Sequence, residues 1–223
     1  MEILFDTANL EAIETMSPIY PISGVTTNPT IIKAEGRIDF YPHFRRIRSI
    51  IGRERTLHVQ ILARESDGII ADAHRLLDQI DENVYVKIPT NEQGLKAMRA
   101  LKSEGVNVTA TAIYSKTQGI LAIAAGADYI APYFNRMESL DIDTSATIKS
   151  LAKFIDRHGA SCKIMAASFK NVAQVSAAFE AGAAAVTLPP ALLRASLAAP
   201  DVTQAVNAFA EDWYDTFGID TLP

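Results

Sequence analysis

The sequence predicts a (β/α)8 barrel, because short apolar runs alternate with helical patterns along its whole length. Eight runs rich in β-branched residues read as strands, near residues 2–5, 22–26, 56–60, 83–87, 107–111, 128–132, 162–168 and 184–187. Strict alternation of strand and helix indicates a parallel sheet, and eight units favour its closure into a barrel. A doubly wound open sheet is the alternative. It should show a glycine-rich turn after the first strand, where this chain has Asp6-Thr7-Ala8-Asn9.

The helices between these strands are predicted from apolar residues at helical spacing, over 66–80, 91–104, 115–124, 144–157 and 171–181. Capping signals open three of them, at Ser66-Asp67, Thr90-Asn91 and Asp143-Thr144. Four helices are followed by a glycine, as a left-handed C-terminal cap requires: Gly105, Gly126, Gly159 and Gly182. No charge run or low-complexity linker interrupts the pattern. We therefore expect one barrel domain over residues 1–223, which includes a C-terminal helix at about 201–217.

Composition excludes several classes of function. The chain has 223 residues, a hydrophobic fraction of 48% and a net charge of −5, so it lacks the basic surface that nucleic acids or anionic membranes require. No apolar stretch is long enough to span a bilayer. The single cysteine, Cys162, and an acidic N-terminus without a signal peptide are typical of a cytoplasmic protein. The histidines have no metal-ligand spacing and no glycine-rich phosphate loop is present, so we expect neither a metal nor a cofactor.

Lys87 ends an apolar run, Val84-Tyr85-Val86-Lys87-Ile88, and Pro89 follows directly. An ammonium buried without a partner costs on the order of several kcal/mol. A lysine in such a strand therefore either reaches water with its head group or loses its proton, and a neutral amine attacks carbonyl carbons. This run alone leaves both interpretations open.

Polar side chains stand where nearly every predicted strand ends. In chain order they are Asp6, Thr26, Thr27, Asn28, Gln60, Lys87, Thr111, Tyr133, Ser168 and Thr187. The carboxyl ends of barrel strands carry the functional residues of this architecture, so the pattern favours a catalytic mouth over solvated loop starts. A lysine in such a ring indicates Schiff-base chemistry on a carbonyl substrate.

The other polar residues suit the remaining steps of that chemistry. Gln60, Thr111 and Tyr133 are the groups available to move protons, together holding one water. Asp6 and Asn28 suit the hydroxyls of a polyol. A terminal phosphate would bind Arg136 and the helix start at Ser168-Phe169-Lys170, through fixed charge and backbone amides. A phosphosugar-binding barrel without catalysis remains an alternative. A phosphosugar isomerase would need a glutamate base at a strand end, and none is present.

The chain resembles the small transaldolase family over essentially its whole length. The motifs that carry the resemblance are Asp6-Thr7, Gly24-Val25-Thr26-Thr27-Asn28-Pro29, Val86-Lys87-Ile88-Pro89, Ala131-Pro132-Tyr133 with Asn135-Arg136, Ala166-Ala167-Ser168-Phe169-Lys170 and Thr187-Leu188-Pro189. The resemblance implies a barrel, a Schiff-base lysine at Lys87 and no metal. It also implies a ring-built homo-oligomer, a pentamer or decamer, in which the C-terminal helix packs at a subunit interface. Substrate-binding residues are expected at Thr27, Asn28, Thr109, Ala131, Arg136, Ala167 and Ser168.

Two positions place the chain on the aldolase side of this family. Transaldolases of the family carry Glu where this chain has Gln60, and Phe where it has Tyr133. The resemblance therefore implies reversible cleavage of fructose 6-phosphate to dihydroxyacetone and glyceraldehyde 3-phosphate. Transfer of a dihydroxyacetone unit between sugar phosphates is the alternative. Thr109 departs from both patterns, because transaldolases have Asn there and aldolases an apolar residue, so it leaves acceptor and donor preference open.

His58 and Tyr85 occupy strand positions where the pattern expects apolar side chains. His58 lies two residues before Gln60, and Tyr85 two before Lys87, so each shares the inward face of its strand. Buried imidazole and phenol groups both need hydrogen-bond partners. We expect these two side chains to bind one another, directly or through one water, beneath Lys87. Separate backbone partners, or a register that turns His58 outward, are the alternatives.

Overall fold

The computed structural model describes residues 1–222 and contains a closed barrel of eight parallel strands. The strands are β1 (Glu2–Asp6), β2 (Gly24–Thr26), β3 (Thr56–Gln60), β4 (Tyr85–Pro89), β5 (Val108–Ile113), β6 (Tyr129–Pro132), β7 (Lys163–Ala166) and β8 (Ala185–Leu188). Each pairs with its neighbour along the chain, and β8 pairs with β1. The predicted barrel is therefore confirmed, and the open-sheet alternative is wrong.

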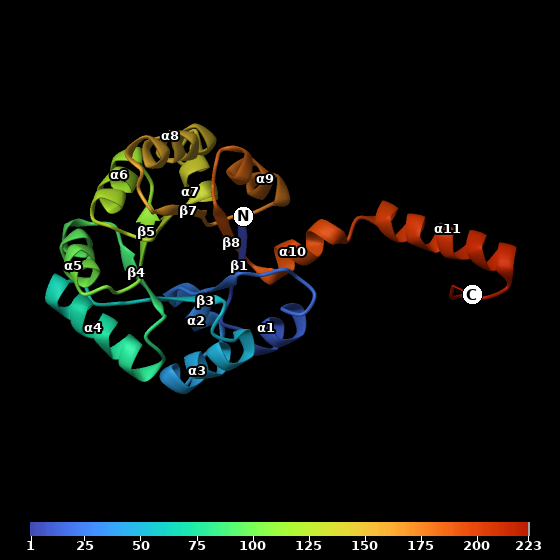
Figure 1. Ribbon diagram of the computed structural model, residues 1–223, viewed down its shortest axis with the longest axis horizontal. Helices are drawn as coiled ribbons and strands as arrows, with labels where there is room; N and C mark the ends of the chain where they lie inside the picture. Colours follow the sequence, from blue (N-terminus) through green and yellow to red (C-terminus); the bar gives the residue numbers. More distant parts are fainter. Residues whose placement is uncertain (223) are drawn as a thin grey trace. The chain divides into compact units, whose positions relative to one another are not determined.

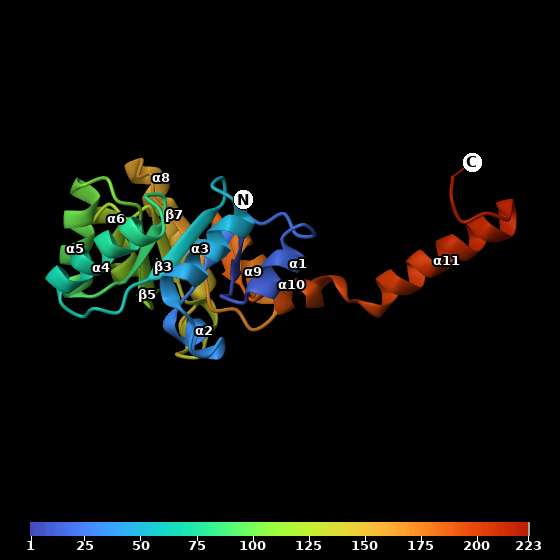
Figure 2. The same cartoon turned by 90° about the horizontal axis from the view of Figure 1, so that it is seen from below.

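Helices surround the strands in a ring (Figure 1). They are α1 (Leu10–Met16), α2 (Pro29–Ala34), α3 (Phe40–Ile51), α4 (Ser66–Gln79), α5 (Glu92–Ser103), α6 (Lys116–Ala124), α7 (Phe134–Glu138), α8 (Thr144–His158) and α9 (Val172–Glu180). The five predicted helices are confirmed to within two residues at each end. In the side view, α2 lies at the opposite end of the barrel from the N-terminus, as expected for a helix that follows the carboxyl end of β2 (Figure 2).

Two of the three predicted helix starts are confirmed and one is wrong. Asn91 and Asp143 cap α5 and α8, with side-chain oxygens that accept from backbone N–H groups three residues later. Glu65, rather than the predicted Ser66-Asp67 pair, is the N-cap of α4, and its side chain makes no capping bond. The Ser66 backbone N–H instead donates to Gln93 Oε1 of α5 at 3.1 Å. A neighbouring helix thus supplies the acceptor that local sequence was expected to provide.

The register of the strands aligns the middle of the predicted site. Gln60 pairs with Lys87 across β3 and β4, and Lys87 pairs with Thr109 across β4 and β5. Paired residues on neighbouring strands point to the same face of a sheet. Val86 and Ile88, on either side of Lys87, are fully buried. The apolar residues thus face the surrounding helices, and the polar row faces the barrel interior.

The chain divides into two compact units, Met1–Pro190 and the segment from Ala191 onward. After α10 (Pro190–Leu197), the second unit contains α11 (Pro200–Phe217), which confirms the predicted C-terminal helix. Its apolar stripe is exposed, most strongly at Phe209 with 71%. Packing of this stripe at a subunit interface stays a prediction. Within residues 1–222, every helix is too short or too polar to cross a membrane.

Candidate active site

Lys87 is buried in the barrel interior with 2% of its surface exposed. Its Nζ donates a hydrogen bond to the backbone carbonyl of Thr27 at 3.2 Å. Within the described part of the chain, Lys87 forms no salt bridge. A buried amine held only by a neutral carbonyl is not committed to an ion pair, so it can attack an electrophile. Thr27 therefore contributes to the site through its backbone.

Thr111 of β5 and Tyr133, which follows β6, meet through their hydroxyl groups. Thr111 Oγ1 and the Tyr133 hydroxyl lie 2.9 Å apart, although they come from different strand ends. A β-bulge in β5 accompanies this contact, because the register with β6 shifts between Ala110 and Ile113 and Ala112 has a φ of 56°. Bulges next to active sites commonly redirect a side chain. A positive φ at alanine costs roughly 1–3 kcal/mol, and the surrounding structure must sustain it.

Gln60 carries an unsatisfied polar atom in the same region. Its Oε1 is buried and has no hydrogen-bond partner among residues 1–222. A buried acceptor left without a donor costs about 1–3 kcal/mol. The atom is therefore a natural acceptor for a water or a substrate hydroxyl, which is consistent with the predicted shared water.

Asp6 and Asn28 stand on the other side of the mouth. Asp6 Oδ1 accepts from Thr26 Oγ1 at 2.7 Å, and that hydroxyl is 2.6 Å from Thr187 Oγ1. The Asn28 carboxamide oxygen caps α2 by accepting from the Thr30 and Ile31 backbone N–H groups. The amide nitrogen is thus the part of Asn28 left for a substrate hydroxyl.

Arg136 projects from α7 and lies against two tyrosines. Its Nη1 donates to the Tyr114 hydroxyl at 3.1 Å, and its guanidinium carbon is 4.6 Å from the centre of the Tyr133 ring. The pKa of Arg136 is raised, first by the hydrogen bond to Tyr114. Ser168 follows β7 with a φ of 66°, and its carbonyl accepts from the Asn135 backbone N–H at 2.9 Å. This bond joins the two segments predicted to bind phosphate.

The remaining predicted substrate-binding residues are small and buried. Ala131 lies in β6, and Ala167 forms a parallel bridge with Tyr133. Thr109 is fully buried, and its hydroxyl lies 2.8 Å from His58 Nδ1. The Thr109 hydroxyl, which the family pattern lacks, therefore already has a hydrogen-bond partner inside the protein.

The expected hydrogen bond between His58 and Tyr85 is wrong. Their rings stack, with centroids 4.6 Å apart and planes inclined by 23°. The two imidazole nitrogens of His58 instead pair with Thr109 Oγ1 and, at 2.9 Å, with Thr56 Oγ1. Side-chain layers inside such barrels come from alternate strands, so β3 meets β5 more readily than β4. The pKa of His58 lies well below 6.5, first because the imidazole is buried and second because of the charge of Lys87.

Three residues that support the site were missed by the sequence analysis: Tyr114, Gln118 and Gln174. Gln118 Oε1 accepts from the Tyr114 backbone N–H, and Gln174 Oε1 accepts from that of Lys170. Each glutamine stands three residues after the capping residue of its helix, Ser115 or Asn171. A capping residue followed three positions later by glutamine is a recognisable helix-start signature and could have drawn attention to both glutamines.

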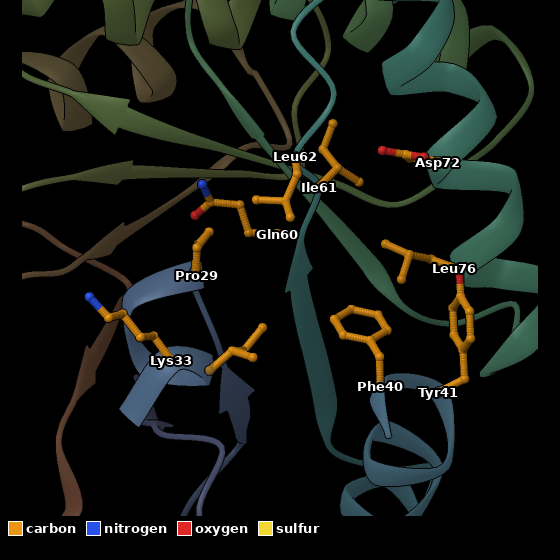
Figure 3. Close-up of a pocket in the computed structure, with 10 residues that line it drawn as sticks. Pro29, Lys33, Phe40, Tyr41, Gln60, Ile61, Leu62, Asp72 and Leu76 are labelled. Carbon is orange, nitrogen blue, oxygen red and sulfur yellow. The ribbon is translucent and has the colours of Figure 1, made fainter. Parts of the chain in front are cut away.

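An apolar cavity of about 480 Å³ adjoins the mouth at Gln60. Figure 3 shows its walls, which come from α2, α3 and α4 and from the segment after β3: Pro29, Ile32, Lys33, Phe40, Tyr41, Ile61, Leu62, Asp72 and Leu76. Gln60 is the one member of the predicted site that lines it. The cavity thus lies beside the strand-end residues, and we define the candidate site by those residues rather than by the cavity.

Comparison with known proteins identifies the family of the chain and finds similar proteins. The model of the family described as Transaldolase/Fructose-6-phosphate aldolase matches residues 3–219. A protein of Streptococcus pneumoniae (strain ATCC 700669 / Spain 23F-1), described as a probable fructose-6-phosphate aldolase, is 48% identical over 214 residues. That match covers 96% of this chain and 96% of the relative.

Proposed function

The chain belongs to the transaldolase/fructose-6-phosphate aldolase family, and we propose that it is a metal-independent class I aldolase. It reversibly cleaves fructose 6-phosphate to dihydroxyacetone and glyceraldehyde 3-phosphate. The observation that carries the proposal is the buried Lys87, which forms no salt bridge within residues 1–222. The hydroxyl pair of Thr111 and Tyr133 supports it.

The reaction begins at the Lys87 amine. It adds to the C2 carbonyl carbon of the sugar, and loss of the carbonyl oxygen as water leaves an iminium. Removal of the proton from the C4 hydroxyl then breaks the C3–C4 bond, which releases glyceraldehyde 3-phosphate and leaves an enamine. Protonation at C3, followed by addition of water, returns the free amine and dihydroxyacetone.

Tyr133 handles the protons of these steps. Its hydroxyl pairs with Thr111, and the unsatisfied Gln60 Oε1 supports a water shared by the three side chains. Geometry of this kind is what general acid–base catalysis requires. Asp6 and the Asn28 amide nitrogen bind sugar hydroxyls. Arg136 and the backbone around Ser168 bind the phosphate. The guanidinium supplies a fixed positive charge, and the backbone supplies N–H donors.

Borohydride reduction tests the covalent step. Treatment of the protein with dihydroxyacetone and borohydride should leave a stable adduct on Lys87, located by peptide mass spectrometry. Lys163→Met, which removes a lysine at the start of β7, is the matched control and should retain the adduct. An adduct on another lysine, or none, would refute the proposal and would favour a phosphosugar-binding barrel.

A substrate panel separates the two activities of the family. Fructose 6-phosphate cleavage should exceed transfer of its dihydroxyacetone unit to erythrose 4-phosphate, because Tyr133 can return a proton to the enamine. Faster transfer than cleavage would assign the chain as a transaldolase instead.

We also propose that the chain forms a homo-oligomer through α11, built as a ring of five subunits or two such rings. The support is the exposed apolar stripe of this helix, which includes Val202, Val206, Phe209 and Phe217. Contiguous exposed apolar surface commonly marks an interaction site. A cytoplasmic location belongs to the same proposal, because a single cysteine suits a reducing compartment.

Light scattering coupled to size-exclusion chromatography tests the assembly. The mass should be five or ten times that of the 24.2 kDa chain. Phe209→Asp should lower it, whereas Leu121→Asp, at an exposed apolar residue of α6, should not. A monomeric wild-type protein would overturn the assembly proposal without affecting the proposed reaction.

A further inference from the structure

Tyr114 follows β5 and joins two parts of the candidate site. Its hydroxyl oxygen accepts from Arg136 Nη1 at 3.1 Å. Its ring stands edge-on to Tyr133, with centroids 5.4 Å apart and planes at 80°. The Arg136 guanidinium also lies 4.6 Å from the Tyr133 ring centre. The three side chains therefore contact one another pairwise.

Tyr114 itself rests on a fixed backbone. Its N–H donates to Gln118 Oε1 at 3.0 Å, while Gln118 Nε2 donates to the carbonyls of Thr90 at 3.0 Å and of Ala112 at 3.3 Å. One side chain of α6 thus ties the end of β4 to the bulge of β5. A residue held in this way can orient a neighbour accurately.

Arg136 needs such support because the side chain is otherwise free to move. It lies on the exposed face of α7, and an arginine loses the rotamer freedom of a long side chain when it is fixed. Contacts that hold the guanidinium before a ligand arrives reduce this cost at the moment of binding. The Tyr133 ring supports one face of the guanidinium, and the Tyr114 hydroxyl fixes one of its N–H groups.

We propose that Tyr114 is a positioning residue for the phosphorylated end of the substrate, because its hydroxyl holds Arg136 against Tyr133. Tyr114 thereby sets the preference for phosphorylated over unphosphorylated aldehydes and ketoses. The inference rests on the proposed function and on the assignment of Arg136 to phosphate binding. It gives Tyr114 no part in imine formation.

The test is Tyr114→Phe, which removes the hydroxyl and keeps the ring that packs on Tyr133. KM for fructose 6-phosphate should rise roughly tenfold, the scale of one hydrogen bond to a charged group. The self-aldol reaction of glycolaldehyde, which carries no phosphate, should change far less. Tyr20→Phe is the matched control, because Tyr20 also stands edge-on to another aromatic ring, that of Phe5.

A double-mutant comparison completes the experiment. In an Arg136→Ala background, Tyr114→Phe should have no further effect on KM, because the group that it positions is gone. Equal losses on both substrates, or additive effects with Arg136→Ala, would overturn the positioning role. If the wild-type protein fails to cleave fructose 6-phosphate and gives no borohydride adduct, the proposed function fails instead, which is a different result.

Discussion

The two ends of the barrel carry the same kinds of side chain in opposite electrostatic settings. At the amino-terminal end, Glu2 accepts from Lys163 Nζ at 2.6 Å and from the Tyr129 hydroxyl at 2.7 Å. At the carboxyl-terminal end, Lys87 donates to a backbone carbonyl, and Tyr133 pairs with a threonine hydroxyl. At the amino-terminal end, one carboxylate pairs with Lys163 and accepts a hydrogen bond from Tyr129. At the carboxyl-terminal end, the partners of Lys87 and Tyr133 are a backbone carbonyl and a threonine hydroxyl.

We expect this difference to separate structural from reactive side chains. Burial, then the hydrogen bond to Glu2 and its negative charge, raise the pKa of Tyr129. Such a phenol keeps its proton, and Lys163 beside it forms a partly exposed ion pair with Glu2. Within residues 1–222, Lys87 and Tyr133 have only neutral hydrogen-bond partners, so we expect their amine and hydroxyl groups to be available to a substrate. Residue type alone does not distinguish the two ends.

The sharpest test compares the two lysines. Lys87→Met should abolish cleavage of fructose 6-phosphate while the protein keeps its circular dichroism spectrum. Lys163→Met should retain activity and lose at most about 1 kcal/mol of stability, the usual value of a partly exposed ion pair. Steady-state kinetics and urea unfolding measure both. Turnover retained by Lys87→Met would remove the contrast between the ends.

The two tyrosines provide the second test. Tyr133→Phe should lower the rate of cleavage by roughly 10²–10⁴-fold, the range for loss of general acid–base catalysis, and should lower transfer less. Tyr129→Phe should leave both rates near wild type and cost about 1–3 kcal/mol of stability, because Glu2 loses a donor. Equal declines in cleavage and transfer in Tyr133→Phe would contradict its role in proton transfer.

Arg136→Ala tests the substrate side of the mouth. KM for fructose 6-phosphate should rise roughly 10- to 100-fold, in line with the loss of hydrogen bonds to a charged group. The self-aldol of glycolaldehyde should be affected much less, because it has no phosphate to bind. A similar loss in both reactions would show that Arg136 supports the structure through Tyr133 and Tyr114.

The smallest expected effect lies between the two ends, at His58. Its imidazole stays neutral in the folded protein but accepts a proton below about pH 6.5 once unfolded. Stability therefore falls as pH drops below 6.5, by up to about 1.4 kcal/mol per pH unit for one proton. His58→Phe should lose this contribution, whereas His74→Phe, at an exposed position on α4, should retain it. Urea unfolding at pH 7.5 and 5.5 measures how the free energy of unfolding changes with pH. An equal change in wild type and His58→Phe would contradict a neutral buried imidazole.

The strands and the place of Lys87 in a buried strand could be predicted because local sequence determines them. The run around Lys87 is apolar enough to be a buried strand, and its register brings Gln60 and Thr109 alongside. The contact of His58 with Thr109 was missed because the prediction paired side chains of neighbouring strands, whereas layers inside a barrel join alternate strands such as β3 and β5. Tyr114 was missed for a related reason. Its proposed role depends on a contact between the turn after β5 and the short helix after β6, and hydrophobic periodicity does not predict such a contact.

Closure of the sheet makes the position of Lys87 depend on every strand at once. Because β4 is paired on both sides within a ring, a one-residue insertion in it would turn the amine away from the interior, and no free edge exists to absorb the slip. The segments after the strands are not constrained in this way and can change in length without moving the amine. Such a chain can therefore acquire new acceptor preferences through loop insertions and deletions, while its strand lengths stay fixed.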